Sequence, residues 1–449
     1  MASGLDTEGL QEAADRFLSP ATRLSFPPVI VEGGQGATFW DLSGRRFLDL
    51  HAMAGVLNIG YAHPRHIQAV VEQVRKLVHC NPAYVMHEAP IRLAERLAAL
   101  TPGAFAKRVA FGLSGSDAND GAIKLARAAT GRQRIIAFSG AYHGNTYGAL
   151  SLSSVSAAMR RGFGPEVPGV VHVPYPDVYR DACRGTVDEV VARCLSELDA
   201  VFEAVAPPED VAAIVLEPVQ GDSGVIVPPQ AYIDGLVERA HRYGILLVAE
   251  EVQTGIGRTG RMCASEHFGL EPDMVILGKA LGGGIPISAI VARSELMDAW
   301  QAPGHVFSTA VSPVAATAAL TVLDIVADED LAGAAEARGA ALLRGLLEMA
   351  ERYPVIGDVR GLGLMLGADL VLDRDSRARN RALTAKVVKG CADRGCFLTF
   401  LAGSVLRFIP PLVITDEQIE HAIGVVEDSL AGALRGDVSD EEVRALTGW

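Results

Sequence analysis

Residues 245–260 read ILLVAEEVQTGIGRTG. The first five are apolar and mostly branched, as in a strand that is buried on both faces of a parallel sheet. The last six, 255–260, match G-x-G-x-x-G, the phosphate-binding pattern of dinucleotide sites. Two glutamates, Glu250 and Glu251, stand between the strand and the glycines. The stretch therefore raises two hypotheses: a dinucleotide site on the glycines, or chemistry carried by an acid at the strand's end.

The spacing argues against the dinucleotide. That fingerprint places its glycines directly at the turn from strand to helix, whereas residues 250–254 separate this strand from Gly255. The residues after Gly257, RTGRM, are not an apolar helix start. An acid at a strand's end can instead pair with a pyridinium nitrogen and keep the ring an electron sink. Glu250 is the candidate for this acid, and Gln253 could donate to the 3-oxygen of such a ring.

The composition is that of a globular protein with a large core. Of 449 residues, 49% are apolar and 21% charged. The formal net charge is −14 without a long basic run, so we expect neither nucleic acid nor a membrane as a partner. No apolar run is long enough for a membrane span, and the acidic N-terminal stretch lacks the features of a signal peptide. Six scattered cysteines without a C-x-x-C pair favour reduced thiols in a cytoplasmic protein over a metal site or disulfides.

Short apolar runs alternate with amphipathic stretches in the middle of the chain, which predicts a mostly parallel sheet with helices on both faces. The amphipathic pattern is clearest at 118–129 and 232–243. The apolar runs that predict strands are 108–113, 134–138, 170–174, 211–217, 245–249, 274–277 and 287–292.

The two ends of the chain have a different pattern. Residues 28–50 are typical of a small strand-turn unit, and 62–100 of two helices. From about 314 onward we expect long helices, a strand at 357–370, another at 405–415 and a final helix from Thr415. We therefore predict a large α/β domain at 62–313, and a small α+β domain formed by 1–61 together with 314–449.

A lysine follows one of the predicted strands. Lys279 comes just after the apolar run 274–277 and before three glycines. A buried ammonium group is costly, and a Schiff base with pyridoxal phosphate (PLP) removes that cost. The alternative is a lysine that extends from the strand's end into solvent. The residues around Lys279 do not by themselves distinguish the two.

Two more segments follow predicted strands. In 114–119, SGSDAN, small residues open a helix whose free N–H groups and positive dipole end could bind a phosphate, although an ordinary helix cap would look the same. Tyr142 could stack on a flat ring or could simply be packed in the core. Each signal is weak alone. Together they fall at the C-terminal strand ends of one sheet, where open α/β sheets bind ligands.

From about Gly34 to its C-terminus the chain resembles the class III aminotransferases, PLP enzymes of the aspartate-aminotransferase-like fold. It is similar within that family to the racemase branch, the amino-acid racemases and 2-epimerases and, more distantly, the caprolactam racemases, whose ending resembles Thr447-Gly448-Trp449. The family segments are SGSDAN, YHG (142–144), EPVQGDSG (217–224), EEVQTGIGRTG and GKALGGGIP (278–286). The racemase-branch segments are FGLSGSDAND (111–120), VHVPYPDVYR (171–180), APGHVFSTAVSPVAATAAL (302–320) and VLRFIPPLVIT (405–415).

This resemblance implies a role for each candidate residue. Arg407 matches the arginine that grips a substrate carboxylate with both arms, which favours an amino acid over a lactam. Asp222 matches the second base of the racemase branch. For the cofactor, Lys279 would bind PLP covalently, Gly115 and Ser116 would hold the phosphate with Ser308 or Thr309 of a partner subunit, Tyr142 would stack on the ring, Glu250 would face its nitrogen and Gln253 its 3-oxygen. No metal is expected.

Glu250 departs from the family, which usually has aspartate at this position. The extra methylene moves the carboxylate by about 1.5 Å. We therefore expect either that the ring lies farther from the strand or that the side chain folds back.

These observations predict a PLP-dependent racemase or 2-epimerase that exchanges the Cα proton of an apolar amino acid between two bases. Residues 53–57 and 400–402 could line a pocket for a branched side chain or could be plain core. One alternative is an ordinary aminotransferase, which passes the amino group to a keto acid. Another is a PLP-binding regulatory protein without activity. The family resemblance implies a homodimer or a dimer of dimers.

Overall fold

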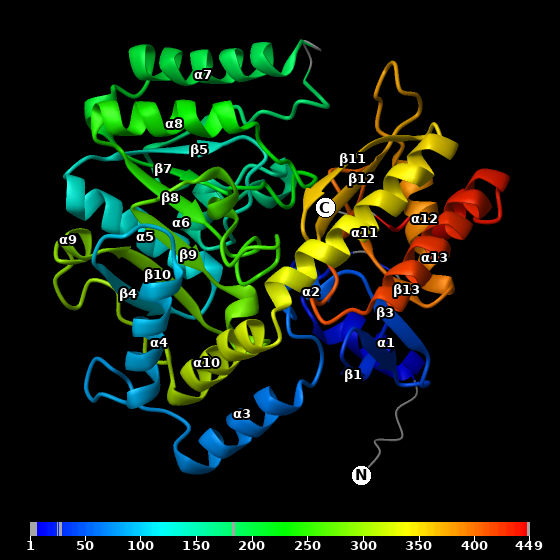
Figure 1. Ribbon diagram of the computed structural model, residues 1–449, viewed down its shortest axis with the longest axis horizontal. Coiled ribbons are helices and arrows are strands. Elements are labelled where there is room, and N and C mark those ends of the chain that lie inside the picture. The colour runs from blue at the N-terminus through cyan, green and yellow to red at the C-terminus, as the bar shows by residue number, and fades with distance from the viewer. Residues whose placement is uncertain (1–6, 25, 27–28, 182–184, 447–449) are drawn as a thin grey trace.

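The computed structural model describes residues 7–24, 26, 29–181 and 185–446 (Figure 1). Cys183 and the ending Thr447-Gly448-Trp449 lie outside these residues. None of the helices in the described residues is long and apolar enough to cross a membrane.

A seven-stranded sheet dominates the left half of Figure 1, in the order β4-β10-β9-β8-β7-β5-β6. β10 is antiparallel to both of its neighbours, and the other pairs are parallel. The predicted mostly parallel, seven-stranded sheet is thereby confirmed. Its strands are β4 (Lys107–Gly112), β5 (Arg134–Phe138), β6 (Val170–Val173), β7 (Val211–Leu216), β8 (Leu246–Glu250), β9 (Met274–Leu277) and β10 (Ser288–Arg293).

Helices cover both faces of this sheet. Alternate residues of a strand point to opposite faces, so Ile136 and Phe138 pack with α7 (Val187–Ala204) and α8 (Gln230–Tyr243). Their neighbours in β5 pack on the opposite face, with α5 (Gly115–Thr130). β7 is buried along its whole length, which explains why it reads as a continuous apolar run rather than an alternating one. The short helices α6 (Tyr147–Leu152) and α9 (Ser294–Met297) complete this part.

The two chain ends meet in a small four-stranded sheet. Its order is β1-β2-β3-β13, and the pairing of β3 with β13 joins the N-terminal strands to residues near the C-terminus. A second four-stranded sheet has the order β11-β12-β15-β14. The strands are β1 (Val31–Gln35), β2 (Thr38–Asp41), β3 (Arg46–Asp49), β11 (Ile356–Leu362), β12 (Met365–Leu370), β13 (Cys396–Phe397), β14 (Thr399–Leu401) and β15 (Val405–Phe408).

Two expectations for this region were wrong in detail. Residues 357–370 are not one strand but the hairpin of β11 and β12, because Gly363 takes a left-handed conformation (φ +52°) and turns the chain between them. The strand expected over 405–415 ends at Phe408, before Pro410 and Pro411. Proline lacks the N–H that a strand interior needs.

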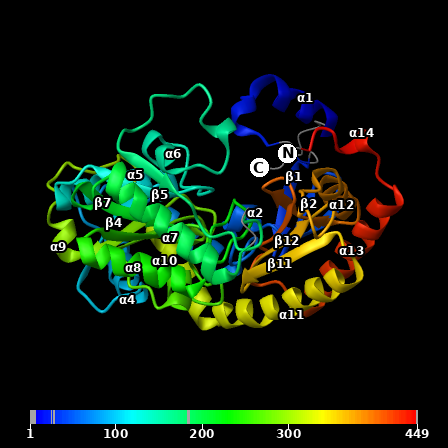
Figure 2. The ribbon, with the colours of Figure 1, turned by 90° about the horizontal axis from the view of Figure 1, so that it is seen from above.

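Long helices pack beside these sheets. α10 (Pro313–Asp328) packs against α3 (Pro64–Lys76) and α4 (Glu88–Leu100). Figure 2 shows α2 (Ala52–Gly55) in the centre of the molecule, between the large sheet and the sheets of the chain ends. The other helices are α1 (Thr7–Phe17), α11 (Leu331–Arg352), α12 (Arg381–Asp393), α13 (Asp416–Arg435) and α14 (Asp440–Val443).

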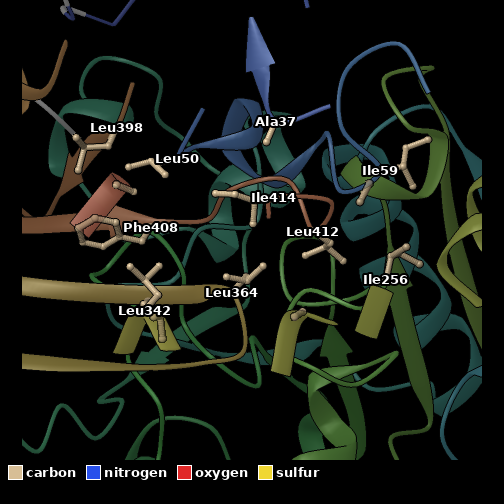
Figure 3. Packing of buried hydrophobic residues seen from close by; sticks show 14 of the residues in the cluster. Ala37, Leu50, Ile59, Ile256, Leu342, Leu364, Leu398, Phe408, Leu412 and Ile414 are labelled. Carbon is tan, nitrogen blue, oxygen red and sulfur yellow. The ribbon is translucent and has the colours of Figure 1, made fainter. Parts of the chain in front are cut away.

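One hydrophobic cluster joins the large sheet to both chain ends. Ile256, from the glycine stretch 255–260, packs in this cluster with Ile59 and Leu412 (Figure 3). Residues 255–260 form turns rather than a helix. Arg258 in the same stretch is fully buried and donates to the side chain of Asn58 at 2.6 Å and to the carbonyl of Leu364 at 2.8 Å. The glycine stretch is therefore a packed connection between parts of the fold.

Candidate active site

The C-terminal ends of five strands of the large sheet bring the predicted residues together. Gly278, which precedes Lys279 after β9, lies against the start of α5: a Cβ on Gly278 would be 3.4 Å from the backbone nitrogen of Gly115. After β5 and β7, the N–H of Tyr142 donates to Oε1 of Glu217 at 3.0 Å. The site is thus built from loops that follow β4, β5, β7, β8 and β9, as expected for an open α/β sheet.

The start of α5 can bind an anion. Ser114 is the N-cap, and it exchanges hydrogen bonds with Asp117 in a capping box. Among the described residues, no acceptor takes the N–H groups of Gly115 and Ser116, which lie in the first turn. A Cβ on Gly144 would lie 2.2 Å from Oγ of Ser116, so only glycine fits there. Ser114, rather than Ser116 or Asp117, caps the helix, and the two free N–H groups remain as donors that could bind a phosphate.

Lys279 is half-buried and holds a left-handed backbone conformation with φ +41°. Within the described part of the chain its side chain forms no hydrogen bond or ion pair. The pKa of His51 is lowered first by burial, then by the charge of Arg407, and then by the charge of Lys279. A strained lysine without a partner at a strand's end suits covalent binding of a carbonyl group.

Glu250 ends β8 and is buried. Its Oε1 accepts from the N–H of Val252 at 2.7 Å, and its Oε2 lies 3.2 Å from Nδ1 of His143. The side chain therefore folds back on its own loop, which corresponds to the second of the two arrangements expected for a glutamate here. Burial, and then the charge of Glu250, raise the pKa of Glu217 to about 7. The site thus holds two neighbouring buried carboxyl groups.

Gln253 and Tyr142 flank this pair. Gln253 is buried and its Oε1 has no partner among the described residues, so its amide can present either oxygen or NH₂ to a ligand. Burial, and then the charges of Asp222 and Glu250, raise the pKa of Tyr142 to about 12. Tyr142 therefore lies near both acids as a neutral phenol.

Asp222 and Arg407 form a buried ion pair. Oδ1 of Asp222 accepts from Nη1 of Arg407 at 2.7 Å, and both side chains are almost fully shielded from water. Nη2 of Arg407 lies 2.6 Å from Nε2 of His51. Burial, then the charge of Arg407, lower the pKa of His51 well below its usual range, so the imidazole is neutral and accepts this hydrogen bond. A carboxylate that binds both arms of Arg407 therefore competes with Asp222 and His51 for this guanidinium.

Ser308 and Thr309 are not brought to these residues. They are exposed in a turn, and the amide of Asn81 donates to the carbonyl of Ser308 at 3.1 Å. Next to this turn lies an apolar cavity of about 380 Å³, bordered by Asn81, Met86 and Phe307. Large apolar side chains are exposed nearby, with Tyr84 at 85% and Met86 at 76% of their full accessibility.

Three site residues escaped the sequence interpretation. His143 follows Tyr142 directly, and its position after a strand was a signal for it. Glu217 ends a predicted strand, and Glu250 directly follows another. His51 gave no signal, because it follows a strand of the small sheet and reaches Arg407 only through the fold.

These residues fit a cofactor with a phosphate and a protonated ring. The start of α5 offers N–H donors, Lys279 offers an amine without a partner, and Glu250 offers a buried carboxylate. Gln253 adds an unpaired amide. Such a donor set matches PLP, and the chemistry open to it is that of amines and their α-carbons.

Comparison with known proteins gives the same picture. The family model of class III aminotransferases matches residues 20–430. The chain is 39% identical to isoleucine 2-epimerase of Lentilactobacillus buchneri over 441 residues, which cover 98% of each chain. It is also 39% identical to leucine/methionine racemase of Thermococcus litoralis, over 98% of this chain and 99% of the relative. A PLP-bound amine transaminase from an uncultivated Pseudomonas species is 31% identical, with a TM-score of 0.86 over 93% of this chain and 99% of that one.

Proposed function

Because the chain belongs to the class III aminotransferase family, we propose that it is a PLP-dependent racemase or 2-epimerase of an apolar amino acid, with branched-chain amino acids as the first candidates. The family match spans most of the chain. Two relatives with full-length similarity are named for the epimerisation of isoleucine and the racemisation of leucine and methionine. These names support an apolar substrate.

When bound, PLP supplies the electron sink that makes the Cα proton of an amino acid removable. Lys279 accepts this proton on one face of Cα. Asp222, once it has left Arg407 and taken up a proton from solvent, returns that proton on the other face, directly or through a water, as a two-base exchange requires. Arg407 binds the substrate carboxylate with both arms. The residues that would hold PLP are Lys279 (through Nζ), Gly115 and Ser116 (phosphate), Glu250 (ring nitrogen), Gln253 (3-oxygen) and Tyr142 (ring face), with Ser308 or Thr309 of a second copy at the phosphate.

The Asp222–Arg407 ion pair is the observation that carries this proposal. In a 2-amino acid, Cα is one bond away from the carboxylate carbon. A substrate carboxylate on Arg407 therefore places Cα next to the guanidinium that Asp222 already contacts at 2.7 Å. By taking over Arg407, the carboxylate also frees Asp222 from its ion pair. An acid freed beside the reacting carbon is what a second base needs.

An aminotransferase is the second candidate. Aminotransferases of 4-aminobutyrate and 5-aminovalerate are also relatives. In those ω-amino acids the reacting carbon lies several bonds from the carboxylate. The contact of Asp222 with the carboxylate-binding arginine favours a 2-amino acid as the substrate, and the presence of a second base favours inversion.

A single incubation separates the two functions. The purified holoenzyme is mixed with L-isoleucine alone, without a keto acid, and the products are resolved by chiral chromatography. Formation of D-allo-isoleucine is the expected result, and the Lys279→Ala variant serves as the inactive control. Turnover that requires added 2-oxoglutarate or pyruvate would establish an aminotransferase instead.

We also propose that the protein is a homodimer or a dimer of dimers. The exposed apolar residues Tyr84, Val85 and Met86 lie beside the turn that carries Ser308 and Thr309. A second copy on this surface would cover apolar side chains that a monomer leaves in water. It would also bring the hydroxyl groups of Ser308 and Thr309 within reach of a phosphate.

We further propose a cytoplasmic location. The five cysteines in the described part of the chain are unpaired, and four of them are buried. Buried free thiols suit a reducing compartment.

A further inference from the structure

Asp222 lies on a tight loop, residues 220–226, after β7. Two hydrogen bonds between Gln220 and Ile226 close the loop, at 3.0 and 2.8 Å. Inside it, the N–H groups of Gly224 and Val225 both donate to the carbonyl of Gly221. Val225 is fully buried with φ +57°, a conformation that is unfavourable for a β-branched residue. The loop therefore needs bonds from outside to hold its shape.

Arg360, in β11, supplies these bonds. Its Nε donates to the carbonyls of Gly224 at 2.9 Å and Val225 at 3.1 Å, and its Nη2 donates to Gly224 at 2.6 Å. No other donor in the described residues bonds these two carbonyls. The side chain of Arg360 is 13% exposed. One guanidinium thus holds the loop at Gly224 and Val225, two and three residues after Asp222.

Two aspartates hold Arg360 in turn. Its Nη1 lies 2.6 Å from Oδ2 of Asp358, and its Nη2 lies 3.8 Å from Oδ2 of Asp369. Asp369 is fully buried and accepts two hydrogen bonds from Arg180, at 2.7 and 2.6 Å. Arg360 is therefore a fixed, charge-balanced anchor.

This anchor gains importance when substrate binds. In the structure Asp222 is held from one side by Arg407 and from the other by its own backbone. A substrate carboxylate on Arg407 removes the first contact. From then on, the loop backbone alone sets the position of the Asp222 carboxylate, and Arg360 holds that backbone.

We propose that Arg360 is a positioning residue, which places Asp222 for proton return after substrate has taken over Arg407. The proposal rests on the proposed function, because it gives Asp222 the role of second base. Arg360 touches neither substrate nor cofactor and acts through the loop.

The test compares Arg360→Lys with unchanged holoenzyme. Lysine keeps the charge but loses the fork that reaches two carbonyls at once. L-Isoleucine and D-allo-isoleucine are each incubated in D₂O. Two rates are followed: loss of the Cα–H signal by NMR, and inversion at Cα by chiral chromatography. Arg374→Lys is the matched control, because Arg374 also donates to main-chain carbonyls of the same region, those of Ala350 and Ile356, but does not contact the loop.

We expect inversion by Arg360→Lys to slow by about tenfold or more, since a misplacement of about 1 Å in a reacting group can cost 10²-fold. The isomer whose Cα–H faces Lys279 should still exchange its hydrogen at nearly the unchanged rate. In Arg360→Lys, KM and the PLP absorption band should remain near those of the unchanged enzyme. In the control Arg374→Lys, the exchange rate and the inversion rate should both remain near those of the unchanged enzyme. Unchanged inversion in Arg360→Lys, or a fall of exchange and inversion in equal proportion, would overturn the proposal.

Two further variants complete the test. Arg360→Gln keeps an amide donor without the charge, and loss of PLP binding in both Arg360 variants would make Arg360 a structural residue and overturn the proposal. Asp222→Asn tests the underlying function. If Asp222→Asn inverts isoleucine as fast as the unchanged enzyme, Asp222 is not the second base. If Asp222→Asn loses inversion while Arg360→Lys keeps it, the proposed function stands and the positioning role alone fails.

Discussion

Asp222 and Arg407 lie 185 residues apart in the chain and meet as a buried ion pair at 2.7 Å. In the proposed function, Arg407 is the partner of an internal acid in the free enzyme and of the substrate carboxylate in the complex. Competition between the two acids for Arg407 has measurable consequences.

The Asp222→Asn variant should bind carboxylates more tightly and invert amino acids more slowly. Asparagine removes the negative charge that competes for Arg407, so isovalerate, a branched acid without an amine, should inhibit at lower concentration. Loss of a general acid–base group should slow inversion by about 10²-fold or more. Inhibition constants and chiral chromatography measure the two effects. Asp393→Asn, in a surface ion pair with Lys389, is the control, and weaker inhibition by isovalerate in Asp222→Asn would contradict the competition.

The Glu250→Asp variant should keep PLP bound and raise turnover. Glu250 divides its oxygens between the N–H of Val252 and His143, whereas the shorter aspartate is the residue typical of the family. A firmer contact with the ring nitrogen keeps that nitrogen protonated and strengthens the electron sink. The PLP absorption band and the inversion rate measure the result. Glu250→Gln, which carries no charge, should lose turnover, and a large loss of PLP and turnover in Glu250→Asp would show a site adapted to glutamate.

Stability of the cofactor-free protein should depend on Glu217 as pH changes. Burial raises the pKa of Glu217 from 4.5 to about 7, so the folded state holds this proton more tightly than the unfolded state. The resulting stabilisation is complete below pH 4.5 and is lost as pH rises through about 7. Relative to Glu217→Gln, the free energy of unfolding should therefore fall by up to about 3 kcal/mol from pH 5 to 8.

Urea unfolding of both proteins at several pH values measures this difference. Glu166→Gln is the control, because a hydrogen bond from Arg160 lowers the pKa of Glu166. Stability from a lowered pKa is already complete above pH 4.5, so this control should show no loss between pH 5 and 8. If the free energy of unfolding of the unchanged protein, relative to Glu217→Gln, stays constant or rises from pH 5 to 8, Glu217 does not have this role.

The Met86→Glu variant should weaken self-association. Met86 is 76% exposed in the single chain, so a charge there leaves the subunit fold intact but becomes costly once a second copy buries it. Light scattering should show a multiple of 47.3 kDa for the unchanged protein and a shift toward that mass for the variant. Leu347→Glu, at an exposed position of α11, is the matched control. A monomeric unchanged protein would contradict the proposed dimer.

The sequence predicted the seven strands of the large sheet to within one or two residues. Strands such as β5 and β9 are short branched apolar runs between turn residues, and this signal is local. The start of α5 was placed at Ala118 rather than Gly115, because a glycine and a serine in a first turn look like loop. The short strands β13 and β14 were missed, because two or three residues are too few to show the alternation of apolar and polar residues that is typical of a strand.

The candidate site was predictable where its residues follow strands. Lys279, Glu250, Tyr142 and Asp222 all come just after, or end, apolar runs, and parallel strands align their carboxyl ends. The contacts among them were not predictable. His143 meets Glu250 across 107 residues, and His51 meets Arg407 across 356. Neither spacing is a property of any local segment.

The sequence by itself determined the large sheet, the edge at which its chemistry lies and the kind of cofactor that edge fits. Hydrophobic periodicity, glycine turns and residue type act over a few positions, so they can be recognised in a single chain. Only the tertiary structure decided that Asp222 pairs with Arg407, that Glu250 folds back on Val252, and that Arg360 holds the loop of Asp222 from 136 residues away. The physical reason is that both chain ends pack onto the large sheet, and this packing sets which distant charges become neighbours.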